Sequence, residues 1–322
     1  MKKLFLITSA TALFFAGCQK NNLTTDNGSS ELRRNCSSME VLSAQMNADP
    51  TLESRMTAYE DVIQNNIKKI ENGTANLRLV NGVIEIPVVV NVLYRTTAEN
   101  ISAAQIQSQI DVLNEDFNAT NADFSKVPST FSGVKANVGI RFVLDQVIRK
   151  STTKTSWKTD DAMKKSSRGG INPTSPTTKL NLWSCTLSGG VLGYAQFPGG
   201  SSATDGVVIL NKAFGRTGTA AAPFNKGRTA THEVGHWLNL RHIWGDATCG
   251  SDLVSDTPTH NTANYGCPAA GHKSTCTGTP VEMTMNYMDY TDDACMYMFS
   301  NGQKSRILAT FATGGPRNSF AQ

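Results

Sequence analysis

The chain has 322 residues, of which 39% are hydrophobic and 17% charged, and its formal net charge is +4. This composition excludes a disordered or fibrous protein and leaves length for one or two domains with a sizeable core. Lysines and arginines are scattered without a basic cluster, so we expect no nucleic-acid partner.

The first residues predict export. Two lysines precede an apolar run over residues 4–15, which is too short to span a bilayer. The run ends at Phe15-Ala16-Gly17-Cys18, which resembles a bacterial lipobox, although Phe15 replaces the usual aliphatic residue. We therefore expect a lipoprotein-type signal peptide over residues 1–17 and a lipid anchor at Cys18 that does not span the membrane, with ordinary secretion as the alternative.

The next segment predicts a tether followed by a helical region. Residues 19–34 are polar and indicate a flexible tether. Residues 36–70 carry apolar side chains three and four positions apart, as one face of a helix requires: Met56, Tyr59, Ile63, Ile67 and Ile70. We expect the tether and this separate helical segment to occupy residues 18–80, with a boundary near 76–85 and a second domain over 81–322.

The rest of the chain alternates strand and helix patterns. Expected strands cover residues 86–94, 139–148, 179–187 and 206–210, with a candidate edge strand over 192–197, and expected helices cover 102–117 and 229–240 and begin again at Ser300. Residues 151–178 are polar and predict a long surface excursion, and residues 243–282 are rich in loops. This order indicates an α/β sheet domain.

One short segment concentrates metal-binding residues. In His232-Glu233-Val234-Gly235-His236 the two histidines are four residues apart, so they lie on one face of a helix and can reach one ion. Glu233 is turned about 100° from His232, which places it beside the metal, where it can take a proton from a zinc-bound water. His242 is the expected third ligand, and three histidines leave one position open for that water.

His242 can reach the ion only if the helix stops sharply before it. Such a stop needs a residue in the left-handed conformation, and Asn239 is tolerant of it. The alternatives are histidines on a solvated helix surface, or a downstream glutamate ligand, for which Glu282 is the only candidate. We interpret His260 and His272 as surface residues.

The segment His232–His242 resembles the metzincin signature, with Asn239 at the usual glycine position. Together with Ile243-Trp244-Gly245-Asp246 and the later Met285–Asp293 segment it is similar to the pappalysin-type metzincins, the cytophagalysin or ulilysin-like M43 group. The resemblance implies a zinc endopeptidase that acts on polypeptides. It also implies a twisted, mostly parallel sheet with an antiparallel edge strand, an active-site helix and a loop-rich C-terminal subdomain, preceded by a helical prosegment.

The resemblance assigns further roles. Met288 matches the methionine of the turn beneath the zinc, and Tyr290 matches a tyrosine that stabilises the tetrahedral intermediate. Residues 192–197 match the edge strand that pairs with an extended substrate. The resemblance also implies the disulfides Cys249–Cys276 and Cys267–Cys295, whereas the sequence alone allows three pairings of these four cysteines, and a second zinc site built from them is the competing interpretation.

Latency is a further implication of the resemblance. Arg33-Arg34-Asn35-Cys36 is similar to the prosegment motif in which a cysteine thiolate takes the open zinc position, although Ser37 replaces the usual glycine. The alternatives for Cys36 are a free thiol or a disulfide to Cys185. Cys185 lies in an apolar strand pattern and is expected to be buried.

Two acidic stretches complete the predicted site. Asp252, Asp256 and Thr257 lie where related enzymes bind calcium, so calcium is a second candidate ion beside zinc. Asp292 and Asp293 lie near the expected S1′ pocket, where negative charge would favour Arg or Lys after the cut bond. The leading hypothesis is a monomeric, latent, anchored metalloprotease, and the alternative is a non-catalytic binding module with the same fold.

Overall fold

The computed structural model describes residues 33–321, so Cys18 and the predicted signal peptide lie outside the described residues. The described α-helices are α1 (Ser38–Ala48), α2 (Leu52–Glu71), α3 (Ala103–Phe117), α4 (Arg228–Trp237) and α5 (Asn301–Phe311). The strands are β1 (Ile84–Tyr94), β2 (Ile140–Ser151), β3 (Leu180–Cys185), β4 (Gly193–Ala195) and β5 (Val207–Leu210). Short 3-10 helices cover Ala122–Lys126, Ser129–Phe131, Ala162–Lys164, Ser166–Arg168, Ser202–Thr204, Asn211–Ala213 and Asn318–Phe320.

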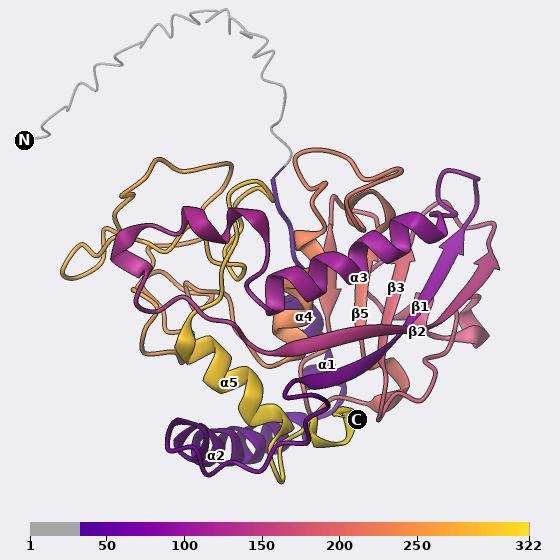
Figure 1. Ribbon diagram of the computed structural model, residues 1–322. Coiled ribbons are helices and arrows are strands. Elements are labelled where there is room, and N and C mark those ends of the chain that lie inside the picture. The colour runs from indigo at the N-terminus through magenta and orange to yellow at the C-terminus, as the bar shows by residue number, and fades with distance from the viewer. Residues whose placement is uncertain (1–32, 322) are drawn as a thin grey trace, which may run out of the picture. The chain divides into compact units, whose positions relative to one another are not determined.

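The five strands form one twisted sheet in the order β2-β1-β3-β5-β4 (Figure 1). All neighbours pair in parallel except β4, which runs antiparallel to β5 at the edge. Parallel pairs require crossover connections, and α3 supplies one between β1 and β2. The mostly parallel sheet with an antiparallel edge strand, which the family resemblance implied, is confirmed.

Each face of the sheet has its own apolar core. Alternate residues of β1, among them Ile86 and Val88, pack with α3 and α4 in the larger core. On the other face, Trp183 and Val208 pack with Trp157 and other residues of the segment between β2 and β3. The prediction that residues 151–178 form a surface excursion is therefore wrong in part, because its few apolar side chains cover this second face.

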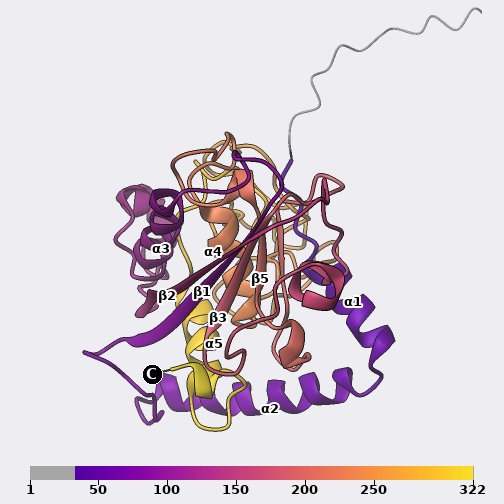
Figure 2. The same ribbon diagram turned by 90° about the vertical axis from the view of Figure 1, so that its right-hand side faces the viewer.

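The N-terminal helical region consists of two helices rather than one. Pro50 lies between them, and proline fixes φ and disfavours helix in the preceding residue, so the chain turns at Asp49 and Pro50. The α1 helix contacts β4. The α2 helix packs across α5 (Figure 2). Residues 74–79, which follow α2, have no regular secondary structure and lead to β1 through the bridge between Val80 and Val83.

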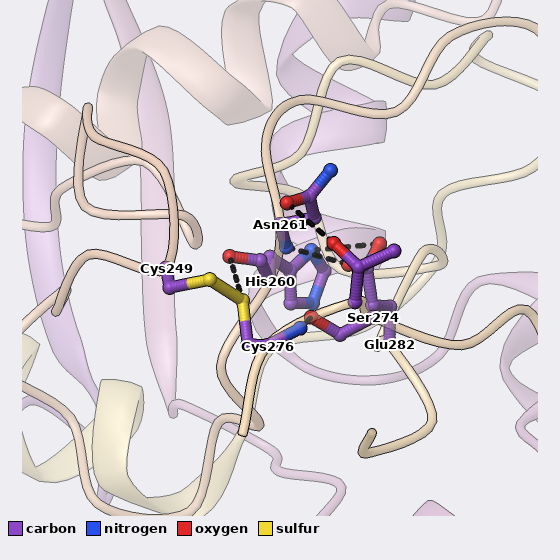
Figure 3. The surroundings of a disulfide bond; sticks show 7 residues. Cys249, His260, Asn261, Ser274, Cys276 and Glu282 are labelled. Carbon is purple, nitrogen blue, oxygen red and sulfur yellow. Dashed lines mark hydrogen bonds and ion pairs between the residues drawn. A yellow bond between two sulfur atoms is a disulfide. The ribbon is translucent and has the colours of Figure 1, made fainter. Parts of the chain in front are cut away.

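The segment between α4 and α5 contains no α-helix or strand, as the sequence predicted. Disulfides Cys249–Cys276 and Cys267–Cys295 cross-link it, in the pairing that the family resemblance implies. Figure 3 shows His260 next to the first disulfide. The interpretation of His260 as a surface residue is wrong: it is fully buried, and its Nε2 accepts a hydrogen bond from the Met283 amide.

Within residues 33–321, no helix is both long enough and apolar enough to cross a membrane.

Candidate active site

The three predicted histidine ligands meet at the end of α4. His232 and His236 lie one turn apart on the helix, and all three imidazoles are buried. The Nε2 atom of His236 is 3.2 Å from that of His232 and 3.1 Å from that of His242. Two nitrogens bound to one tetrahedral zinc ion at about 2.0–2.1 Å are themselves about 3.3 Å apart, so the donor set fits zinc.

The other ring nitrogen of each ligand has a fixed partner. The Nδ1 atoms of His232 and His236 lie 2.7 and 2.8 Å from the carbonyl oxygens of Tyr287 and Leu240. Carbonyl oxygens only accept, so Nδ1 carries the proton and Nε2 keeps its lone pair for the metal. His242 Nδ1 lies 2.5 Å from a carboxylate oxygen of Asp246. Burial lowers the pKa of His232 and His236, which favours the neutral, metal-binding form.

Asn239 makes the sharp stop that the third ligand requires. Its φ is 70°, in the left-handed region, as predicted from its place in the sequence. The Leu240 amide then donates back to the Gly235 carbonyl, which ends the helix. The chain can therefore bring His242 back beside His236. Glu282 lies elsewhere, where its carboxylate accepts from Asn261 and Asn264, so the alternative of a glutamate ligand finds no support.

Cys36 completes the group of potential ligands. Its sulfur and the three histidine nitrogens lie within 4.8 Å of one another, and Cys36 is 3% exposed. Cys36 and Cys185 are both buried free cysteines, so the alternative of a disulfide between them is wrong, and the predicted burial of Cys185 is confirmed. Burial raises the pKa of the Cys36 thiol, and the nearby Glu233 carboxylate adds to this. A bound metal ion acts in the opposite direction, because its positive charge favours the thiolate.

Glu233 lies beside the metal-binding group. Its Oε2 accepts a hydrogen bond from Ser38 Oγ at 2.8 Å, and Cys36 Sγ lies 3.3 Å away. Burial raises the pKa of Glu233 to about 7. The backbone of β4 leaves no spare room here, because a Cβ on Gly193 would lie 2.9 Å from Glu233 Cγ. The carboxylate is therefore positioned close to the edge strand.

Tyr290 and Met288 approach the ligands from the loop that the second disulfide, Cys267–Cys295, closes. The Tyr290 hydroxyl donates to the Cys36 carbonyl oxygen at 3.1 Å, and its ring centroid is 4.9 Å from that of His242. Met288 is fully buried against α4, where a Cβ on Gly235 would lie 2.4 Å from its sulfur. The glycine in the helix thus leaves space for the methionine.

A buried ion pair that the sequence did not predict lies next to the histidines. Arg34 Nη2 is 2.6 Å from Asp293 Oδ1, and both side chains are almost fully buried. Arg34 also donates to Thr229 Oγ1 and to the Thr291 carbonyl, each at 3.1 Å. The sequence contained the signals separately, as a pair of basic residues before Cys36 and a pair of acidic residues after Tyr290. Only the fold joins two residues 259 positions apart.

The candidate calcium residues have hydrogen-bond partners within the chain. Thr257 Oγ1 lies 2.9 Å from both carboxylate oxygens of Asp252. Asp256 accepts from the Ser300 hydroxyl and the Gly302 amide, so it lies at the N-terminus of α5, where negative charge is favourable. Calcium binding at this loop stays a prediction.

Comparison with known proteins agrees with this geometry. Residues 181–312 match the Peptidase_M43 family, described as pregnancy-associated plasma protein-A. An extracellular metalloprotease of Pyricularia oryzae is 35% identical over 254 residues, which cover 75% of this chain and 79% of the relative. That relative and others are named extracellular, which supports export of this chain.

Two solved structures resemble the fold over most of its length. Mature mirolysin of Tannerella forsythia, in complex with a cleaved peptide, is 46% identical, with a TM-score of 0.72, and covers 74% of this chain and 96% of its own. A promirolysin variant is 42% identical, with a TM-score of 0.80, and covers 89% of this chain and 97% of its own. The sheet, the active-site helix and the histidine cluster define a zinc metalloendopeptidase of the metzincin class. The chain belongs to the M43 or pappalysin-type family of metalloproteases.

Proposed function

We propose that this chain is a latent, monomeric zinc endopeptidase in which residues 34–38 block every working part of the active site. The observation that carries the proposal is that three residues of this one segment touch three different groups. Cys36 lies among the histidine ligands, Ser38 donates to Glu233, and Arg34 pairs with Asp293. A segment that blocks the metal position, a carboxylate and a charged pocket together indicates that all three act on substrate.

His232, His236 and His242 would hold the zinc, and Cys36 would be the fourth ligand in the latent form. When bound, zinc polarises the scissile carbonyl and makes a water molecule more acidic. Glu233 accepts a proton from the attacking water at Oε2 and passes it to the leaving amine. In the latent form this Oε2 atom accepts a hydrogen bond from Ser38. The Tyr290 hydroxyl donates to the oxygen that gains negative charge, in the place where it now meets the Cys36 carbonyl.

The edge strand would bind an extended substrate through the backbone groups that now bind the prosegment, with the substrate running in the opposite direction to the prosegment, which lies parallel to this strand. The Leu192 amide donates to the Asn35 carbonyl, and the Ser37 amide donates to the Gly193 carbonyl. These backbone groups become available once the segment leaves, and they fit any extended peptide irrespective of its sequence.

The experiment uses the full-length chain after limited proteolysis has removed the first two helices. We expect it to cleave a mixed peptide pool, and a zinc chelator to abolish cleavage until zinc is restored. Mass spectrometry of the products identifies the cut sites. No cleavage by protein that retains one zinc per chain would instead favour the non-catalytic binding module.

We propose that the pocket at Asp293 selects Arg or Lys after the cut bond, because Arg34 already fills it with a short ion pair. Asp293 also accepts from the Lys226 and Arg228 amides, which fixes its carboxylate. Asp293→Asn removes the charge and keeps the shape, so kcat/KM for peptides with Arg at this position should fall at least about tenfold. Asp292→Asn is the matched control and should keep the preference. Equal loss in both variants, or none in Asp293→Asn, would contradict the assignment.

We also propose that Cys18 carries a lipid anchor on an exported chain. The support is the sequence alone: a short apolar run that ends in Phe15-Ala16-Gly17-Cys18. The intact mass of the protein extracted with detergent tests this, because an unmodified or absent Cys18 would contradict it.

A further inference from the structure

Two buried arginines hold the C-terminal end of the active-site helix. Arg306 Nε donates to the Asn239 carbonyl at 2.9 Å, and Arg317 Nε donates to the Trp237 carbonyl at 3.1 Å. The last carbonyls of a helix lack partners within it and carry partial negative charge, so a guanidinium group there is doubly favourable.

The two arginines differ in the origin of their counter-ions. Arg317 makes two short contacts, 2.6 and 3.0 Å, with Asp205, which lies in the proposed catalytic domain. Arg306 makes a similar pair, 2.8 and 2.6 Å, with Glu60, which lies on α2 of the proposed prosegment. Removal of the prosegment therefore leaves Arg317 paired and takes the carboxylate away from Arg306.

Arg306 lines a cavity of about 570 Å³ between the prosegment helices and the catalytic domain. The two walls carry opposite charge. Arg241 and Arg306 come from the catalytic side, whereas Glu53, Glu60 and Asp61 come from α2. The apolar part of the catalytic wall is Phe197, which packs against residues of α1 and α2. The surface exposed by prosegment removal thus combines one aromatic ring with two cations.

This cavity and the Asp293 pocket lie in opposite directions along the edge strand. Following the prosegment from Arg34, Asn35 pairs with Leu192 and Ser37 with Gly193, and Ser38 Oγ accepts from the Ala195 amide. The α1 helix then continues toward Phe197. A peptide that binds across the metal would therefore have its residue after the cut bond near Asp293 and its preceding residues toward Arg306.

We propose that Arg306, with Arg241 beside it, becomes a carboxylate-binding site in the activated enzyme and takes an Asp or Glu side chain of the substrate, N-terminal to the cut bond. The inference rests on the proposed function. Arg306 stays oriented after Glu60 leaves, because Nε remains bound to the Asn239 carbonyl and only Nη1 and Nη2 lose their partner. A guanidinium group already held in position binds a carboxylate through two parallel bonds with little ordering cost.

The test uses full-length chain activated by limited proteolysis and a series of peptides with Arg after the cut bond. The peptides come in matched pairs that have Glu or Gln at the same position before the cut bond. From one pair to the next, this position moves one residue further from the bond. We expect one position in the series at which Glu raises kcat/KM about fivefold over Gln at low salt, equivalent to ~1 kcal/mol for a partly exposed pair. High salt should reduce this ratio toward one.

Arg306→Gln should bring the Glu-to-Gln ratio to about one, and Arg241→Gln should lower it in part. Arg317→Gln is the matched control, because it removes a similar guanidinium from the same helix end, and its ratio should equal that of the wild type. The ratio is compared within each variant, so a general loss of stability does not affect it. Equal rates for Glu and Gln at every position would overturn this inference alone. No cleavage of either peptide would overturn the proposed function and this substrate site with it.

Discussion

Activated chain carrying Glu233→Gln should lose about 10²- to 10⁴-fold in kcat for peptide hydrolysis, the usual contribution of a general base. The amide has the size of the carboxylate but cannot take a proton at Oε2. Burial raises the pKa of Glu233 to about 7 in the latent form. A carboxyl group with such a pKa can both take up and release a proton near neutral pH.

Metal content separates this effect from damage to the site. Glu233 is beside the ligands rather than among the four grouped atoms, so the variant should bind zinc as the wild type does. His236→Ala is the comparison, because it removes a ligand and should lose both zinc and activity. A Glu233→Gln enzyme that keeps most of its kcat would show that another residue moves the proton.

Cys36→Ala in the intact precursor should raise peptide hydrolysis at least about tenfold over the wild-type precursor. The substitution destabilises the closed form, in which the segment covers the site, and each ~1.4 kcal/mol of lost stability increases the fraction of open molecules tenfold. The variant should nevertheless remain slower than the activated enzyme. The buried Arg34–Asp293 pair and the Ser38–Glu233 hydrogen bond still hold the segment in place.

Ser38 provides the sharper test of this latency. Adding Ser38→Ala to Cys36→Ala should increase precursor activity at least about fivefold more, since it removes the hydrogen bond to Glu233, worth ~1 kcal/mol, together with the one that Ser38 Oγ accepts from the Ala195 amide. Ser37→Ala is the matched control, because Ser37 contributes its backbone amide, which the substitution keeps. Activity should be measured on uncleaved protein, verified by mass. A Cys36→Ala precursor as inactive as the wild type would show that the thiol is not what blocks the metal.

Local spacing was enough to predict the metal-binding part of the site. The positions of His232, His236 and Glu233 follow from helix geometry, and the left-handed conformation of Asn239 follows from the need to return His242 to the ion. The order of strands and helices along the chain and the helical character of the N-terminal region also followed from residue patterns, although the break at Pro50 divides the predicted helix.

The contacts that spacing could not predict are those between distant segments. The Arg34–Asp293 pair joins positions 259 apart, and the Arg306–Glu60 pair joins positions 246 apart. No periodicity relates such residues, because their distance depends on how the whole sheet and its helices pack. The prediction that His260 lies at the surface failed for the same reason. Its polar neighbours in the sequence indicated exposure, whereas the disulfide Cys249–Cys276 and the surrounding loops bury it.

The arginines at the end of α4 also bear on the order of biosynthesis. The ribosome releases the three histidines well before Arg306 and Arg317, yet these two side chains hold the carbonyls on either side of the helix end. A nascent chain that has just exposed His242 therefore carries the three histidines without Tyr287, whose carbonyl holds the His232 ring, and without the two arginines at the end of their helix. We therefore expect stable metal binding to follow the folding of a segment that contributes no histidine of its own, after the whole chain has been made.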